Sequence, residues 1–272
     1  MTQAGVLTPR SIPEEPRHPR VTPIEFYQDG QVSRIALDQS VQVPTPAGPL
    51  PAELLLFHRD GSLKRVFPTN GKLNDLWTLE DEQRLVPRLR VRTPVGEIAA
   101  RFISIAFHPG GSLRSVTLWP GDRVAVQTPI GRVDVRQGLS FRRDGSLESL
   151  EPARPIVVDT PLGRMEAFDP QPIGLNADAN SLGFGPDGEV AALTTVRDIV
   201  TVMLADGSPR RFVPSVSAND CADSCATGEV VKLRFESDTI TLRVGPTRET
   251  HPIANASLER RDDGRRHLPC LG

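Results

Sequence analysis

The chain has 272 residues, enough for one large repeat array or two ordinary domains. Its 32 basic and 34 acidic residues nearly balance, which argues against nucleic acid or another strongly charged partner. Its 22 glycines and 26 prolines are spread along the chain and not pooled in a linker, so we interpret them as turn residues.

Residues 1–22 contain no apolar run long enough for a signal peptide or a membrane-spanning helix. We therefore expect a disordered leader here, a cytoplasmic location, and no membrane partner.

A repeated cassette dominates residues 23–214. It consists of Phe, two variable residues, Asp or Asn, Gly, and then two aliphatic residues three positions apart. Asp-Gly and Asn-Gly supply the positive φ angles of two-residue hairpin turns, so each copy predicts a β-hairpin. The copies are Phe26–Ile35, Phe57–Val66, Phe67–Leu76, Phe141–Leu150 and Phe184–Leu193, together with Phe107–Val116, which has Gly110-Gly111 at the turn.

A second turn signal, Thr-Pro-x-Gly, alternates with the cassettes. It occurs at Thr45, Thr93, Thr128 and Thr160, each time between alternating apolar residues, and predicts a second set of hairpins.

The aliphatic residues after each cassette turn break the alternation of a regular strand. Leu63 and Val66 are an example: residues three apart in a strand point to opposite faces. The recurrence of this spacing predicts a β-bulge just after each turn.

These patterns predict an all-β protein in which antiparallel hairpin repeats form an open β-roll or solenoid-like array, with a closed β-propeller as the alternative. The only helical signal is at residues 79–85. We expect residues 215–246 to form a loop and a capping hairpin, and residues 247–272 a loosely ordered tail. Exposed edge strands would allow self-association.

The residues with potential chemistry have structural explanations. Asp29, Asp60, Asp144 and Asp187 occupy equivalent turn positions, where one carboxylate is too few for calcium. His58 and His108 occupy a slot held elsewhere by Tyr, Pro, Arg or Gly, so we interpret them as surface histidines.

Cys221 and Cys225 form the only local cysteine pair, and Cys270 is the third cysteine. Free reactive thiols, a disulfide and a metal site remain alternatives, although a zinc site would repeat the cysteine spacing. We predict no catalytic residue, no metal site and no cofactor.

The string from Phe57 to Leu73 holds two aromatic-turn-Gly-x-Leu units ten residues apart. It resembles MORN-type repeats, especially the bacterial variant. The resemblance implies an elongated antiparallel array used for protein or lipid contacts, without catalysis.

Repetition without a catalytic constellation favours a non-catalytic scaffold or protein-binding module with an unidentified protein partner. The alternative is an enzyme or small-ligand receptor whose site is built from the insertions at residues 70–87, 171–181 and 215–229.

Overall fold

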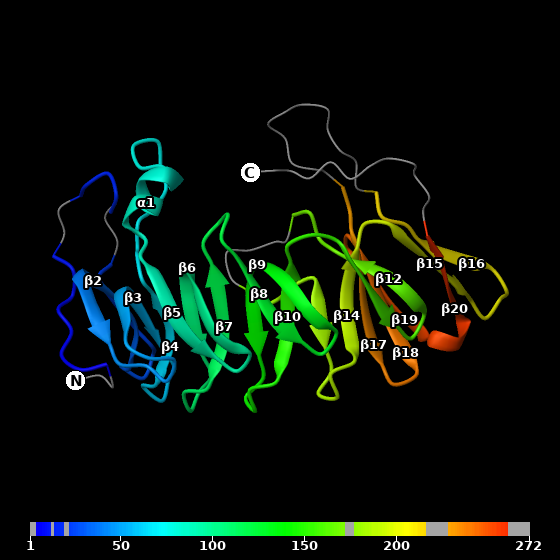
Figure 1. The fold of residues 1–272 in the computed structure, drawn as a ribbon, viewed down its shortest axis with the longest axis horizontal. Coiled ribbons are helices and arrows are strands. Elements are labelled where there is room, and N and C mark those ends of the chain that lie inside the picture. Colours follow the sequence, from blue (N-terminus) through cyan, green and yellow to red (C-terminus); the bar gives the residue numbers. More distant parts are fainter. Residues whose placement is uncertain (1–3, 12–13, 19–21, 172–176, 216–227, 261–272) are drawn as a thin grey trace. The chain divides into compact units, whose positions relative to one another are not determined.

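The computed structural model describes residues 4–11, 14–18, 22–171, 177–215 and 228–260. The chain divides into two compact units (Figure 1). The first contains residues 1–124, 137–146 and 175–178, and the second contains residues 125–136, 147–174 and 179–272.

The strands of the first unit follow the linear order β1-β2-β3-β4-β6-β7-β9, with β5 paired to β6. All these pairs are antiparallel, and the single helix α1 lies between β4 and β5 in the chain. The bounds are β1 Ile24–Phe26, β2 Val32–Val43, β3 Leu50–Phe57, β4 Leu63–Phe67, α1 Leu79–Leu85, β5 Arg88–Thr93, β6 Gly96–Phe107, β7 Leu113–Leu118 and β9 Gly131–Phe141, of which residues 137–141 belong to this unit.

The second unit has a linear sheet in the order β10-β13-β14-β17-β18-β19 and two smaller groups, β11-β12 and β16-β15-β20. The first half of β9 pairs with β8. The bounds are β8 Arg123–Thr128, β10 Leu147–Pro152, β11 Ile156–Thr160, β12 Gly163–Ala167, β13 Leu182–Phe184, β14 Val190–Thr195, β15 Asp198–Met203, β16 Pro209–Phe212, β17 Val231–Glu236, β18 Thr239–Val244, β19 Thr247–Pro252, the 3-10 turn η1 Ile253–Asn255 and β20 Ala256–Arg260.

The all-β class, the antiparallel hairpins and the helix at residues 79–85 are therefore confirmed. In neither unit do the described strands close into a ring.

The cassette turns share one hydrogen-bond pattern. In the Phe57 cassette, His58 donates its N–H to the carbonyl of Ser62, and Gly61 donates to the carbonyl of His58. Gly61 has φ +79°, whereas Asp60 is not among the residues with positive φ. The turn is thus a three-residue loop with one left-handed glycine, and the two-residue turn predicted from Asp-Gly is wrong. Asp60 instead accepts the N–H of Ser62 at 2.9 Å.

A bulge is confirmed directly after four of the cassette turns. Phe57 pairs with Leu63 but Leu56 pairs with Arg65, so Lys64 is an extra residue directly after the turn. The same register shift occurs after the Phe26, Phe107 and Phe184 turns. Because the extra residue resets the alternation, the aliphatic residues three apart face the same side as the cassette Phe. Phe57, Phe107, Phe141 and Phe184 are consequently no more than 2% exposed.

The Phe67 cassette does not form the predicted hairpin. Residues 68–73 lie outside any strand, and Gly71 lacks the positive φ of the other turn glycines. Pro68 explains the difference, because it occupies the position whose N–H closes every other cassette turn and it has no N–H.

The residue after the cassette Phe also joins consecutive hairpins of the first unit. The Tyr27 hydroxyl donates to the Phe57 carbonyl at 2.7 Å. The Nε2 of His58 lies 3.0 Å from the Phe107 carbonyl, and the Nε2 of His108 lies 2.8 Å from the Phe141 carbonyl. A carbonyl oxygen can only accept, so each of these nitrogens carries the proton. The two histidines therefore link neighbouring cassettes instead of being free surface groups.

The two families of turns pack against each other. A Cβ on Gly111 would lie 3.4 Å from the Cγ of Pro46, and one on Gly145 would lie 3.6 Å from the Cγ of Pro94. Pro129 and Gly188 make the equivalent contact in the second unit. Glycine at these positions adopts the left-handed backbone conformation and, because it has no side chain, leaves room for a proline ring to pack against the turn.

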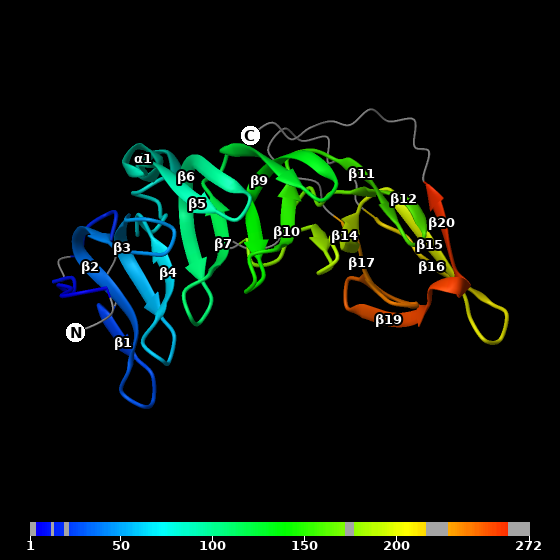
Figure 2. The same cartoon turned by 60° about the horizontal axis from the view of Figure 1, so that its bottom comes forward.

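The described leader and tail residues differ from the expected disorder. Pro9 forms a β-bridge with Leu37, and Arg10 donates its N–H to the Ala36 carbonyl. β17 and β18 form the hairpin predicted within residues 215–246, and β19 then pairs with β18 along its full length, so this hairpin is not the end of the sheet (Figure 2). The chain next returns as β20 to pair with β15.

Replacing His108 with Leu should lower the free energy of unfolding by about 1–2 kcal/mol, because the buried Phe141 carbonyl loses its donor. Equilibrium urea unfolding would measure the loss. His108→Gln should lose less, because a Gln amide can also donate a hydrogen bond. If the Leu variant matches the wild type, the link between cassettes contributes nothing to stability.

Candidate functional site

The insertion at residues 70–87 is fixed to the sheet by a buried ion-pair cluster. Arg17 binds Glu82 through Nε and Nη2 at 2.8 and 2.9 Å, and binds Glu53 of β3 through Nη2 at 2.8 Å. The Arg17 side chain is 14% exposed and that of Glu82 is 3% exposed. One guanidinium therefore holds together the leader, a strand and the helix.

Glu82 is also bound from within the insertion. The N–H of Gly71 donates to its Oε1 at 2.8 Å, and the Nε1 of Trp77 donates to its Oε2 at 2.7 Å. Burial raises the pKa of Glu82, but the bonds from Arg17, Trp77 and Gly71 outweigh it and lower the pKa below its ordinary value. Thr78 and Asp81 cap the start of α1 through reciprocal hydrogen bonds.

This anchored insertion presents leucines to solvent. Leu73 and Leu76 are 52% and 76% exposed, although the same cassette positions are buried or half-buried in hairpins. On α1, the buried Glu82 faces the sheet, and Leu79 and Leu85 lie three positions to either side of it, still partly exposed. These residues, which we call the leucine surface, are Leu73, Leu76, Leu79 and Leu85.

A second polar cluster lies on β4, β6 and β7 of the first unit. Asp178 accepts the Ser115 hydroxyl at 2.6 Å and Nη2 of Arg65 at 2.5 Å, and Arg65 also binds Ser104. Burial raises the pKa of Asp178, but Ser115, Arg65 and Arg114 outweigh it and lower the pKa. With both carboxylate oxygens engaged, this cluster fastens residues 177–178 to the sheet.

The third cluster surrounds Glu151 of the second unit, whose side chain is fully buried. Ser181 donates its N–H and its hydroxyl to the two carboxylate oxygens, each at 2.9 Å. Arg136 lies 3.5 Å from the same carboxylate, donates to the Asp169 carbonyl, and has its guanidinium 4.6 Å from the Phe168 ring centroid. Burial raises the pKa of Glu151 to about 7, although Ser181 and Arg136 oppose the shift. A carboxyl group closed off from solvent cannot reach a substrate, so we assign it a structural role.

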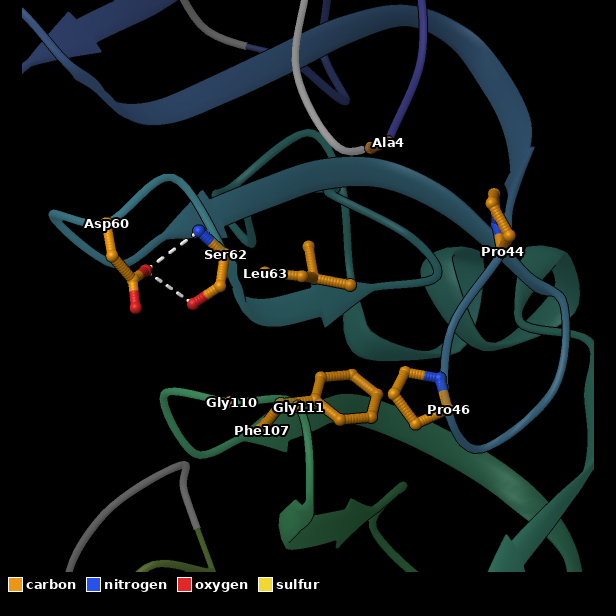
Figure 3. Close-up of a pocket in the computed structure, with 9 residues that line it drawn as sticks. All are labelled: Ala4, Pro44, Pro46, Asp60, Ser62, Leu63, Phe107, Gly110 and Gly111. Atoms are coloured by element: carbon orange, nitrogen blue, oxygen red, sulfur yellow. Dashed lines mark hydrogen bonds between the residues drawn. The ribbon is translucent and has the colours of Figure 1, made fainter.

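A hollow of about 450 Å³ lies between hairpin turns of the first unit. Figure 3 shows Asp60 and Ser62 on one side, Phe107 with Gly110 and Gly111 along another, and Pro44 and Pro46 on a third. Its walls are mostly apolar, and Asp60 is the one carboxylate among the lining residues. Sequence analysis did not predict this hollow, because it depends on how the two families of turns pack.

The predicted turn carboxylates lie where the sequence placed them. Asp29, Asp60, Asp144 and Asp187 each accept the N–H of the residue two positions on. No group of three or more His, Cys, Asp or Glu side chains suited to a metal ion occurs within the described ranges. Cys221, Cys225, Cys270 and most of the loop at residues 215–229 lie outside the described residues.

No helix in the described part of the chain has the length and apolar character needed to cross a membrane. Comparisons with protein-family models, with curated proteins and with solved structures found no significant match.

Replacing Arg17 with Met should destabilise the protein by about 2–4 kcal/mol, because Glu82 would keep a buried charge without its partner. The double variant Arg17→Met, Glu82→Gln should recover part of the loss, since it removes both charges. Hydrogen exchange at residues 70–87 would report the detachment directly. Equal losses in the single and double variants would show that the ion pair does not hold the insertion.

The raised pKa of Glu151 predicts that the free energy of unfolding decreases as the pH rises. Its pKa is about 7 in the folded state against an ordinary value of 4.5, so the folded state binds the extra proton between these pH values. Below pH 4.5, the raised pKa of Glu151 contributes up to about 3 kcal/mol to the free energy of unfolding. This contribution is lost as the pH rises through 7. Unfolding midpoints across this range would measure it. Glu151→Gln should flatten the dependence, and an unchanged slope in that variant would contradict the assignment.

Proposed function

We propose that the protein is a non-catalytic binding module that recognises a protein partner through the leucine surface. The observation that carries this proposal is the exposure of Leu73, Leu76, Leu79 and Leu85 on one firmly anchored insertion. They are four of the ten large apolar side chains that are exposed in the described part of the chain. A contiguous patch of exposed apolar side chains is typical of a protein-interaction surface, and the proposal places these four side chains in one such patch.

Rigidity supports the proposal. Arg17 binds both Glu82 and Glu53, and Thr78 caps α1, so the leucine surface is ordered before a partner arrives. Association then costs less conformational entropy than it would for a flexible loop.

The remainder of the chain is, in this proposal, an open roll or solenoid-like array of hairpins that carries the insertion, as the resemblance to MORN-type repeats implies. The recurring turn, bulge and proline contact support a repeat origin. The first strand, β1, has an exposed edge residue in Phe26, at 60%, which would also permit self-association.

The buried clusters support binding over catalysis. Glu82, Asp178 and Glu151 are each held by donors from within the protein. Their hydrogen bonds attach the insertion at residues 70–87 and the described residues 177–181 to the sheets.

The double variant Leu73→Ser, Leu76→Ser should reduce capture of the partner by at least about tenfold, because central apolar contacts dominate interface energies. Quantitative affinity purification from cells would compare its recovered proteins with those of the wild type. Thermal stability should stay nearly constant, because both side chains are exposed.

The matched control is Val157→Ser, Met203→Ser, which removes apolar side chains that are 43% and 47% exposed in the second unit. This control should capture the same partner as the wild type. A recovered set that the leucine variant leaves unchanged would refute the leucine surface as the binding site.

A further inference from the structure

The hollow between the hairpin turns combines an apolar wall with a single carboxylate at its side. Pro44, Pro46, Leu63 and the Phe107 ring supply the apolar lining. Gly110 and Gly111 have φ of +93° and +92°, so the neighbouring turn contributes backbone and no side chain that would fill the space. The volume of about 450 Å³ is sufficient for a small ligand or one long side chain.

Only one of the two carboxylate oxygens of Asp60 accepts hydrogen bonds from the described residues. Its Oδ1 accepts both the N–H and the hydroxyl of Ser62, at 2.9 and 2.5 Å, and its Oδ2 has no hydrogen-bond partner among the described residues. The hydroxyl and the N–H of Ser62 lower the pKa of Asp60, so the group is ionised at neutral pH.

The side chains of Arg59 and His58, which precede Asp60 in the chain, contact other groups. The Arg59 guanidinium lies 5.5 Å from the Tyr27 ring centroid, and the Nε2 of His58 binds the Phe107 carbonyl. No ion pair to Asp60 occurs within the described ranges. The side of the hollow therefore carries a carboxylate that forms no ion pair with a described residue, although the charge of His58 contributes to lowering the pKa of Asp60.

The Phe141 cassette provides an internal comparison. Asp144 accepts the N–H and hydroxyl of Ser146 in the same way, at 2.8 and 2.7 Å. There, however, the slot after Phe holds Arg142, whose charge helps to lower the pKa of Asp144. Asp144 is also absent from the lining of the hollow. The two turns thus differ in the slot, which holds Arg142 beside Asp144 and His58 beside Asp60, and only Asp60 lines the hollow.

We propose that this hollow binds a cation carried on an apolar stem, with the cation at Asp60 and the stem against Leu63, Pro46 and Phe107. An alkylammonium group has this chemistry, whether it comes from a free amine or from a lysine side chain of a polypeptide. A lysine stem packs on apolar surface while its charged end stays near water, as the open carboxylate requires.

Titration of the full-length protein with hexylammonium, followed by amide NMR, tests the proposal. We expect saturable shifts at Ser62, Gly110 and Gly111 that weaken as the ionic strength rises. Hexanol and hexanoate have the same stem without the positive charge and should bind more weakly. Binding of hexanol equal to that of hexylammonium, or shifts confined to other residues, would overturn the proposal.

Asp60→Asn removes the charge and retains the acceptor that Ser62 needs, so it should fold and should bind hexylammonium about two- to fivefold more weakly. Asp144→Asn makes the same change in the matched turn and should bind like the wild type. Equal losses in both variants would also overturn the proposal.

The source of the cation is resolved by a capped lysine, in which both backbone ends are blocked. Binding as tight as that of hexylammonium would identify a polypeptide side chain, and binding of hexylammonium alone would identify a free amine. Both outcomes support the cation site, and failure of both probes to bind would refute it.

Discussion

The hydrogen bond from the residue after each cassette Phe is the constraint on which the hairpins depend. His58 donates to Ser62 across the turn, which requires a left-handed glycine at position 61. The turn is followed by one extra residue, and this bulge brings the cassette Phe and both aliphatic residues to the same face. A single backbone bond therefore determines the turn geometry, the register of the pair and the contribution of each hairpin to the core.

The Phe67 cassette cannot form this hydrogen bond, and it shows how the chain folds without it. Pro68 has no N–H, and the chain after Phe67 leaves the sheet. Leu73 and Leu76 then lose their usual place in a core and become solvent-exposed. Arg17 and Glu82 replace the missing hairpin bonds as the restraint on this segment. The loss of one hydrogen-bond donor thus accompanies the replacement of a hairpin by an anchored segment with exposed leucines.

Local features of this fold could be predicted from the sequence, and long-range ones could not. The spacing of Leu63 and Val66 was sufficient to predict a bulge, and the acidic first turn was sufficient to place a helix at residues 79–85. Asp-Gly occurs in both two-residue and three-residue hairpin loops, so the sequence did not determine the turn type. The partners of Arg17 lie 36 and 65 positions away, and those of Asp178 lie 63 and 113 positions away, so no local pattern reveals them. The Pro68 exception was readable in principle, but only once the role of that N–H was known.

At the slot after Phe, the backbone and the side chain have separate structural roles. Its backbone is used in the same way in each hairpin cassette, while its side chain is free to vary. In the first unit, His58 and His108 direct their side chains to the next carbonyl, whereas Arg142 places a charge near its own turn. The cassettes at Phe57 and Phe141 otherwise share Arg-Asp-Gly-Ser-Leu, and the residue in the slot helps to lower the pKa of the turn Asp in both, His58 in the first and Arg142 in the second. Because the turn is closed by the backbone, such changes alter the charge and shape of the surface without altering the hairpin. The side chain in the slot and the segment after Phe67 can therefore change while the buried core stays constant.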